Sequence, residues 1–254
     1  DVSALLVGVK DVIADYDYVC FAHDKKVTQL EPYSKGEGFA VKCFENILAS
    51  REFVANVIEQ FEKEPRLGLL TPTPPNHAEY FPIYSYGWSQ NFVRTSRLLR
   101  EMKLDVPLSP EKDVIAPLGT MFWFRPAALK PLFDMDWTYE DFPGEPNDND
   151  GTLLHAVERA YGYVAQGSGY FAGWLYSDKF ARIELTNLSF YVQELTRAIG
   201  YHWPADTEMR MVHTLKEDNG LRRHVKEILR HTIPDRLHSP LRHVYDRTRR
   251  IVKK

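Results

Sequence analysis

Two groups of charged residues in this sequence have types and spacings that suit phosphate and sugar chemistry. The first group, His23, Asp24, Lys25 and Lys26, directly follows an aromatic and β-branched run at 16–21. A carboxylate can hold a divalent metal ion and a lysine can contact a phosphate oxygen, and either would neutralise a diphosphate leaving group. The pattern makes Asp24 the candidate metal ligand, although a solvated turn would have the same composition.

The second group is an acidic loop with five carboxylates within eleven residues, Glu140, Asp141, Glu145, Asp148 and Asp150. Carboxylates this close repel one another, so a metal ion, basic side chains or solvent must offset their charge. One of them could act as a general base that takes the proton of an attacking hydroxyl. The alternative is an exposed loop in which Asp150 is the N-cap of the following helix.

The helix expected at 152–161 places His155, Glu158 and Arg159 on one face, because these residues are three and four positions apart. They could orient the acidic loop as a second layer of residues, although a structural ion pair is the favoured interpretation. The spacing does not indicate a zinc site, since two histidines at metal-binding spacing are absent from this helix.

The run at 119–125 combines small, aromatic and basic residues. Gly119 and Thr120 would leave room for a sugar and Trp123 could stack on it, but taken alone the run favours a core strand. Two residues after the proline-rich loop at 71–75 are weaker candidates for acceptor contacts, which a plain surface loop would equally explain: His77 and Tyr80.

These residues must be positioned by alternating strands and helices. Strands are expected at 16–21, 67–70 and 115–124, and helices at 1–14, 38–64, 89–103, 127–133 and 152–161. Such an order predicts an α/β sheet with ligands at the carboxyl ends of its strands. The charged group at 23–26 and Arg125 each follow a strand, so both are expected at that edge.

The composition is that of a globular protein, with 44% hydrophobic and 13% aromatic residues in 254. No segment approaches the roughly 18 uninterrupted apolar residues of a membrane helix. Cys20 and Cys43 lie in apolar surroundings without a metal or redox spacing, so we expect buried, reduced thiols in a cytoplasmic protein. The chain opens on Asp1 in an apolar run, which suggests a fragment.

The pattern becomes helical and increasingly polar beyond about residue 184, so we expect a body at 1–183 and a helical, basic extension at 184–254. Residues 221–254 hold eleven Lys or Arg against three acids, a net charge of +8, whereas the remainder carries −11. Apolar residues interleave with the basic ones, which suits a peripheral contact with an anionic membrane. A solvated appendage or an oligomer contact would have the same pattern. Nucleic-acid binding is disfavoured, because the acidic body would oppose it.

Taken in order, these segments resemble the rhamnan synthesis protein F family over roughly residues 1 to 175. The resemblance is carried by the runs at 16–26, 67–70, 119–126, 141–146, 150–152 and 155–159. It implies a GT-A-like (Rossmann-like) glycosyltransferase that moves rhamnose, or a related sugar, from a dTDP-activated donor onto a growing surface polysaccharide. It also implies that the family's domain starts earlier, with a nucleotide-binding strand and helix that this chain is expected to lack.

The resemblance also implies roles for the candidate residues. Among the carboxylates, Asp141 and Asp150 are the preferred bases and Glu145 is third, with inversion expected because a base is easier to find than a nucleophile. The implied donor contacts are His23, Asp24, Lys25, Lys26, Gly119, Thr120 and Arg125, and the implied acceptor contacts are Trp123, His77 and Tyr80. Magnesium or manganese on Asp24 is left open. If the acceptor is linked to a lipid, a peripheral contact with the inner face of the membrane would bring the enzyme to its acceptor.

Two other classes of protein would fit part of this pattern. A metal-dependent hydrolase could be built on the acidic loop, but it would need a fuller ligand set than Asp24 and scattered histidines such as His202 and His213 provide. A non-catalytic glycan-binding or assembly subunit could instead use tryptophans as sugar platforms: Trp88, Trp123 and Trp137.

Overall fold

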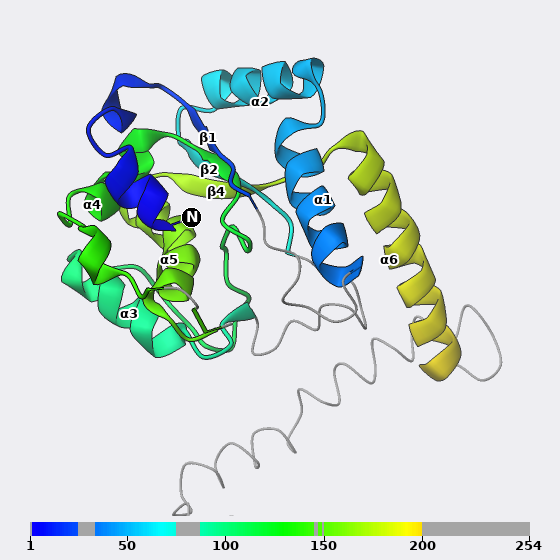
Figure 1. Ribbon diagram of the computed structural model, residues 1–254. Coiled ribbons are helices and arrows are strands. Elements are labelled where there is room, and N and C mark those ends of the chain that lie inside the picture. The colour runs from blue at the N-terminus through cyan, green and yellow to red at the C-terminus, as the bar shows by residue number, and fades with distance from the viewer. Residues whose placement is uncertain (1, 25–33, 75–86, 145–146, 149, 200–254) are drawn as a thin grey trace, which may run out of the picture. The chain divides into compact units, whose positions relative to one another are not determined.

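The computed structural model describes residues 2–24, 34–74, 87–144, 147–148 and 150–199, and these residues are discussed below. Its sheet has four strands, β1 (Val19–Phe21), β2 (Leu67–Pro72), β3 (Phe122–Phe124) and β4 (Phe171–Leu175), in the order β1-β3-β2-β4 (Figure 1). Strand β3 is antiparallel to β1 and β2, whereas β2 and β4 are parallel. The carboxyl ends of β1, β2 and β4 therefore share one edge of the sheet, the carboxyl edge, at which β3 begins.

Helices flank this mixed sheet, and the chain is an α/β protein. The longer ones are α1 (Ser34–Leu48), α2 (Arg51–Lys63), α3 (Phe92–Glu101), α5 (Leu153–Gly167) and α6 (Asp178–Ile199). Shorter turns of helix are Ala4–Gly8, Ile13–Asp15, Pro126–Leu129, α4 (Lys130–Phe133) and Tyr139–Asp141. The chain divides into two compact units, Asp1–Ile183 and Glu184–Lys254. Within the described residues, no helix is both long and apolar enough to span a bilayer.

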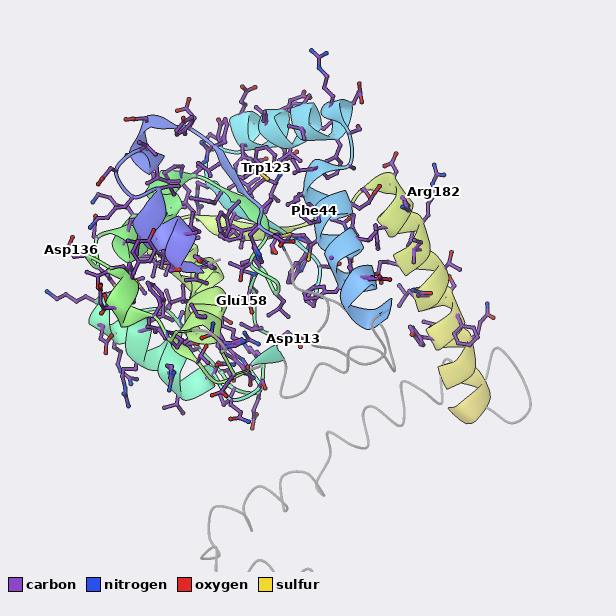
Figure 2. The ribbon with its side chains drawn as sticks, viewed as in Figure 1. Phe44, Asp113, Trp123, Asp136, Glu158 and Arg182 are labelled. Carbon is purple, nitrogen blue, oxygen red and sulfur yellow. The ribbon has the colours of Figure 1, made fainter. Side chains whose placement is uncertain are left out.

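Alternation along the strands creates two cores, one on each face of the sheet. Phe122 and Phe124 of β3 point into a core shared with α3 and α5, while Trp123 between them points into a core shared with α1 and α2. In Figure 2, Trp123 and Glu158 of α5 accordingly lie on different sides of the sheet. Burial of each large apolar side chain contributes about 1.5–3 kcal/mol, so each of these residues strengthens the packing of the helices on the sheet.

Several predicted elements have different limits in the structure. The single helix expected at 38–64 is two helices, because Ser50 begins a new one by accepting a hydrogen bond from the Phe53 amide at 3.1 Å. The helix expected at 1–14 is reduced to short turns at Ala4–Gly8 and Ile13–Asp15. The strand expected at 115–124 is reduced to β3, and β4 was not expected.

Candidate functional site

The carboxyl edge brings His23 beside the turn that leads into β3. His23 follows β1, and its Nε2 lies 3.0 Å from the carbonyl oxygen of Gly119, while its Nδ1 lies 2.8 Å from the carbonyl oxygen of Asp24. The ring of His23 thus lies between two carbonyl oxygens and next to the exposed Asp24.

The Gly119–Thr120 turn has a backbone that most residues avoid. Gly119 has φ +97° and Thr120 has φ +56°, and a β-branched residue in this region is rare. A Cβ placed on Gly119 would lie 2.8 Å from Cζ of Phe39 and 3.2 Å from Sγ of Cys43, so α1 leaves space only for glycine. Such strain costs about 1–3 kcal/mol and persists only where surrounding contacts impose it.

Glu158 supplies those contacts from α5. Its Oε2 accepts hydrogen bonds from the Gly119 amide at 2.7 Å and from Oγ1 of Thr120 at 2.9 Å. Its Oε1 lies 2.7 Å from a guanidinium nitrogen of Arg159, and both residues are buried. A buried ion pair needs this degree of hydrogen bonding to offset the loss of hydration. The expected structural ion pair is therefore present, and it also fixes the turn at the carboxyl edge.

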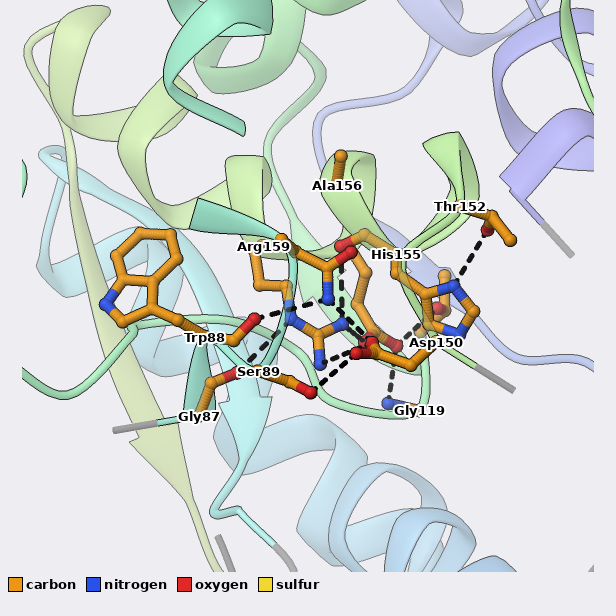
Figure 3. A network of polar contacts seen from close by, with 12 residues as sticks. Gly87, Trp88, Ser89, Gly119, Asp150, Thr152, His155, Ala156 and Arg159 are labelled. Carbon is orange, nitrogen blue, oxygen red and sulfur yellow. Dashed lines mark hydrogen bonds and ion pairs between the residues drawn. The ribbon is translucent and has the colours of Figure 1, made fainter. Parts of the chain in front are cut away.

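Arg159 extends this contact to the acidic loop (Figure 3). Its Nε donates to the carbonyl oxygen of Gly87 at 3.2 Å, and another guanidinium nitrogen lies 3.9 Å from Oδ1 of Asp150. His155 contributes its carbonyl oxygen to Arg159 at 3.3 Å, while its ring Nδ1 lies 2.8 Å from Oγ1 of Thr152. Thr152, rather than Asp150, is the N-cap residue of α5.

Asp150 anchors the turn at 89–91. One carboxylate oxygen accepts from Ser89 Oγ at 2.5 Å and from the Gln90 amide at 3.2 Å, and the other accepts from Nδ2 of Asn91 at 2.6 Å. Partial burial alone would raise the pKa of Asp150, but the hydrogen bonds from Ser89, Asn91 and the amides of Gln90 and Gly151 outweigh it, so the pKa is lowered. Both of its oxygens already accept hydrogen bonds, so Asp150 is better suited to holding the turn at 89–91 in place than to accepting a proton from a substrate.

Asp141 lies in a different environment on the same loop. Its Oδ2 accepts hydrogen bonds from the amide and hydroxyl of Thr138, at 2.8 Å and 3.0 Å, in a capping box around the turn Tyr139–Asp141. Phe142 packs against Trp137 with ring centroids 5.4 Å apart and ties this turn to the core. Among the described residues, none donates a hydrogen bond to Oδ1 of Asp141, and the residue is exposed.

The placement expected for Arg125 is wrong. β3 runs opposite to β1 and β2, so Arg125 lies at the edge of the sheet opposite to His23. There its Nε donates to the carbonyl oxygen of Leu67 at 2.8 Å, and its guanidinium lies over the ring of Tyr18 at 4.9 Å. Both contacts hold the fold together.

Trp123 is buried as a core residue. The residue is 6% exposed, and its Nε1 donates to the carbonyl oxygen of Ile47 at 2.9 Å. A sugar cannot stack on a side chain that is buried in the core, so the structure favours the core interpretation. Trp88 is buried as well, at 1% exposed.

Several candidates lie outside the described residues, namely Lys25, Lys26, His77, Tyr80, Glu145, His202, His213 and the basic tail. Among the residues that are described, no group of three or more His, Cys, Asp or Glu could hold a metal ion. Of the residues predicted to bind a metal ion, Asp24 is thus the one that the described part of the chain includes. Cys20 and Cys43 are both free thiols, as expected, but only Cys43 is buried and Cys20 is partly exposed.

Sequence reasoning missed a second set of polar residues at the carboxyl edge. On α1, Lys42 and Asn46 are buried, at 1% and 0% exposed, on the face that also carries Cys43 and Ile47. The available signal was a lysine at an apolar position of an amphipathic helix. Ser89 and Asn91, the partners of Asp150, gave no such signal, because polar residues in a turn are common.

Comparisons with known proteins agree with the resemblance. A family model described as rhamnan synthesis protein F matches residues 1–170. The chain is also 39% identical over 62 residues to the protein WxcX, which is described as uncharacterized, in two strains of Xanthomonas campestris pv. campestris. That match covers 24% of this chain and 9% of the length of WxcX. No solved structure matches.

Proposed function

Because the chain belongs to the rhamnan synthesis protein F family, we propose that it is a catalytic region of a glycosyltransferase with a GT-A-like fold. The proposed reaction moves a sugar, rhamnose from dTDP-rhamnose, onto a growing cell-surface polysaccharide. The observation that carries the proposal is the connected set of contacts from His23 through Gly119, Glu158 and Arg159 to Asp150. It joins both charged groups of the sequence at the edge where α/β proteins bind ligands.

The donor diphosphate has suitable partners next to β1. His23 is a candidate contact for the diphosphate, and two cations, Lys25 and Lys26, follow Asp24 in the sequence. Asp24 is the residue that would hold magnesium or manganese, which would neutralise the leaving phosphate as the glycosidic bond breaks.

The acidic loop supplies the general base in this proposal. The base takes the proton of the acceptor hydroxyl while that oxygen attacks the anomeric carbon, and the nucleoside diphosphate leaves with the electrons of the broken bond. Asp141 suits this role because Thr138 fixes one carboxylate oxygen and the other has no described donor. Glu145 keeps its place as a second candidate on sequence grounds, and Asp150 positions the loop.

A lipid-linked oligosaccharide at the inner face of the cell membrane is the proposed acceptor. Residues 221–254 carry a net charge of +8, which suits anionic lipids. In α6, large apolar residues are more than two-fifths exposed, among them Leu185, Leu188 and Phe190 at 64%, 58% and 56%. Apolar side chains on a helix near a basic segment support a peripheral membrane contact.

The test is calorimetric titration of the full-length protein with dTDP-rhamnose, beside UDP- and GDP-sugars, with magnesium, with manganese and with EDTA. Selective binding of the dTDP sugar supports the proposal, and loss of binding in EDTA shows that donor binding needs a metal ion, for which Asp24 is the candidate ligand. A folded sample that binds none of these nucleotide sugars would sink the donor assignment, and glycan binding without transfer would favour an assembly subunit.

A further inference from the structure

The outer face of α3 is basic, although most of the chain is acidic. Residues 92–103 hold four basic residues and one acid, a net charge of +3, whereas residues 1–220 together carry −11. All four basic residues are exposed, and none forms an ion pair with a described residue. These residues, the basic face of α3, are Arg94, Arg97, Arg100 and Lys103. Unpaired cations gathered on one surface attract an anionic partner.

Helical geometry adds an apolar side chain to the middle of this basic face. Val93, Arg97 and Arg100 are four and three positions apart, so they lie along one line of the helix. Val93 is 68% exposed, more than any other large apolar residue in the described part of the chain. The opposite side of α3 is directed at the core and carries buried residues: Thr95, Leu98 and Leu99. The outward side therefore offers apolar contact and positive charge together.

A groove of about 440 Å³ runs alongside the basic face, between α3 and the segment that follows it. Its charged lining residues are Arg100 and Asp105, and Ser96 needs no polar ligand, because its hydroxyl donates to the carbonyl oxygen of Phe92 at 2.7 Å. Val93 and Arg100 belong both to the groove and to the outward side of α3. The other lining residues are apolar: Phe92, Leu99, Leu104, Val106 and Leu108.

This combination suits an anion that also carries hydrocarbon. A free phosphate would contact the arginines and leave Val93 and the groove exposed to water. An anionic phospholipid presents a phosphate directly above apolar chains, so it would cover both. Glu101 and Asp105 oppose the attraction, but the four cations of the basic face outnumber them. Nucleic acid offers a dense row of charges without hydrocarbon, and the acidic body would repel it.

We propose that α3 docks on an anionic lipid bilayer, with headgroup phosphates on Arg97 and Arg100 and with Val93 and the groove against the apolar part of the same lipids. This surface belongs to the unit Asp1–Ile183, so it is separate from the contact proposed for α6 and the basic tail. The turn at 89–91, which Asp150 holds, comes just before α3. Docking would thus bring a lipid-linked acceptor near the acidic loop, a consequence that rests on the proposed function.

Vesicle flotation of the full-length protein tests the arginines. The double variant Arg97→Gln and Arg100→Gln should bind vesicles containing phosphatidylglycerol about thirtyfold more weakly than the wild type at about 0.1 M salt. The matched control, Arg51→Gln with Lys63→Gln, removes the same charge from exposed positions of α2, on the other face of the sheet (Figure 1). It should keep nearly the wild-type affinity. None of the variants should bind vesicles of pure phosphatidylcholine better than the wild type does.

Val93→Ser tests the apolar contact. This variant should bind about threefold more weakly at both low and high salt, because salt does not screen apolar contact, whereas the effect of the arginine variant should shrink as salt rises to about 0.5 M. Two soluble probes then separate lipid from free phosphate in calorimetric titrations. Dihexanoyl phosphatidylglycerol, below the concentration at which it forms micelles, should bind the wild type more tightly than inorganic phosphate does.

Three results would overturn the inference. They are equal weakening in the arginine variant and in the α2 control, which would show an effect of net charge alone, unchanged binding in the arginine variant, and equal affinity for inorganic phosphate and the short-chain lipid. Binding of dTDP-rhamnose is measured separately and does not involve α3. A failed lipid surface is therefore distinguishable from a failure of the proposed function.

Discussion

The carboxylate of Glu158 lies 2.7 Å from the amide nitrogen of Gly119, so a side chain of α5 determines the shape of the turn that precedes β3. The same carboxylate also binds Thr120 and Arg159, and all of these groups are buried or nearly so. One side chain thereby accepts hydrogen bonds from three buried donors. Its loss would leave these donors without an acceptor and would lower the free energy of unfolding.

The Glu158→Gln variant should therefore be markedly less stable. An amide cannot accept from all three donors, and it leaves Arg159 without its closest negative charge, so we expect a loss of about 3 kcal/mol in the free energy of unfolding. Urea titration followed by circular dichroism measures it. Glu59→Gln is the matched control, because Glu59 forms an exposed pair with Lys63 at 2.5 Å and should change stability by less than about 1 kcal/mol. Equal effects would contradict the role of Glu158.

Two glycines on neighbouring elements should respond oppositely to alanine. In Gly119→Ala the new methyl meets Phe39 and Cys43 and the backbone has φ +97°, so we expect a loss of about 2–4 kcal/mol. In Gly38→Ala the methyl meets nothing within 4 Å, and alanine favours the helix by about 0.5–1 kcal/mol. Melting temperatures of both variants test this, and a stable Gly119→Ala would show that α1 can move away from the turn.

The pH dependence of the free energy of unfolding should reveal how much Asp150 contributes to stability. Its hydrogen bonds lower its pKa in the folded state, so its contribution is fully present above the ordinary aspartate pKa of about 3.9 and is lost as the pH falls through the lower folded value. Asp150→Asn removes that contribution. The stability difference between wild type and variant should thus be large at pH 7 and shrink at pH 3, as urea titrations can show. A difference that does not change with pH would refute it.

Substitution of the proposed base should affect transfer without affecting donor binding. Asp141→Asn should lower the transfer rate by about 10²–10⁴-fold, because the acceptor hydroxyl loses its proton acceptor. Radiolabelled sugar incorporated into acceptor measures transfer, and calorimetry measures donor binding. Asp136→Asn is the control, since its side chain is 90% exposed and is paired with Lys10. Normal transfer in Asp141→Asn would move the base to Glu145 or elsewhere.

Membrane association should depend on both charge and apolar contact. We expect the protein to sediment with vesicles containing phosphatidylglycerol but not with pure phosphatidylcholine vesicles, and to be released as salt rises from about 0.1 to 0.5 M. The double variant Leu185→Ser and Leu188→Ser on α6 should bind more weakly at low salt, because it removes apolar contact. Equal binding to anionic and to neutral vesicles would contradict this interpretation.

The sequence was most informative where a local pattern was sufficient. Aromatic and apolar runs located β1, β2 and β3, and the i, i+3 and i, i+4 spacing on α5 predicted a structural ion pair among His155, Glu158 and Arg159, which the structure has between Glu158 and Arg159. Strand direction depends on contacts between distant segments, so Arg125 was placed at the wrong edge. β4 was missed because its burial is irregular and it shows no clear alternation.

The positive φ angles at the candidate site could not be predicted from residue types. Gly119 and Thr120 resemble the start of a strand in sequence, and only the distant Glu158 bends them into a turn. Ser89, with φ +49°, is likewise held by Asp150 from sixty-one residues away. Strain of this kind is imposed by tertiary contacts, and local preference gives no sign of it.

The contacts at the carboxyl edge also have a consequence for biosynthesis. His23 and Gly119 are ninety-six residues apart, and Asn46 and Ser177 are one hundred and thirty-one residues apart. A nascent chain cannot close the first contact until Gly119 has left the ribosome, or the second until Ser177 has, so the helices can form early while the full set of contacts forms last. Premature termination anywhere before that point would release a chain with secondary structure, exposed apolar surface and no assembled site, a species that chaperones and proteases would recognise.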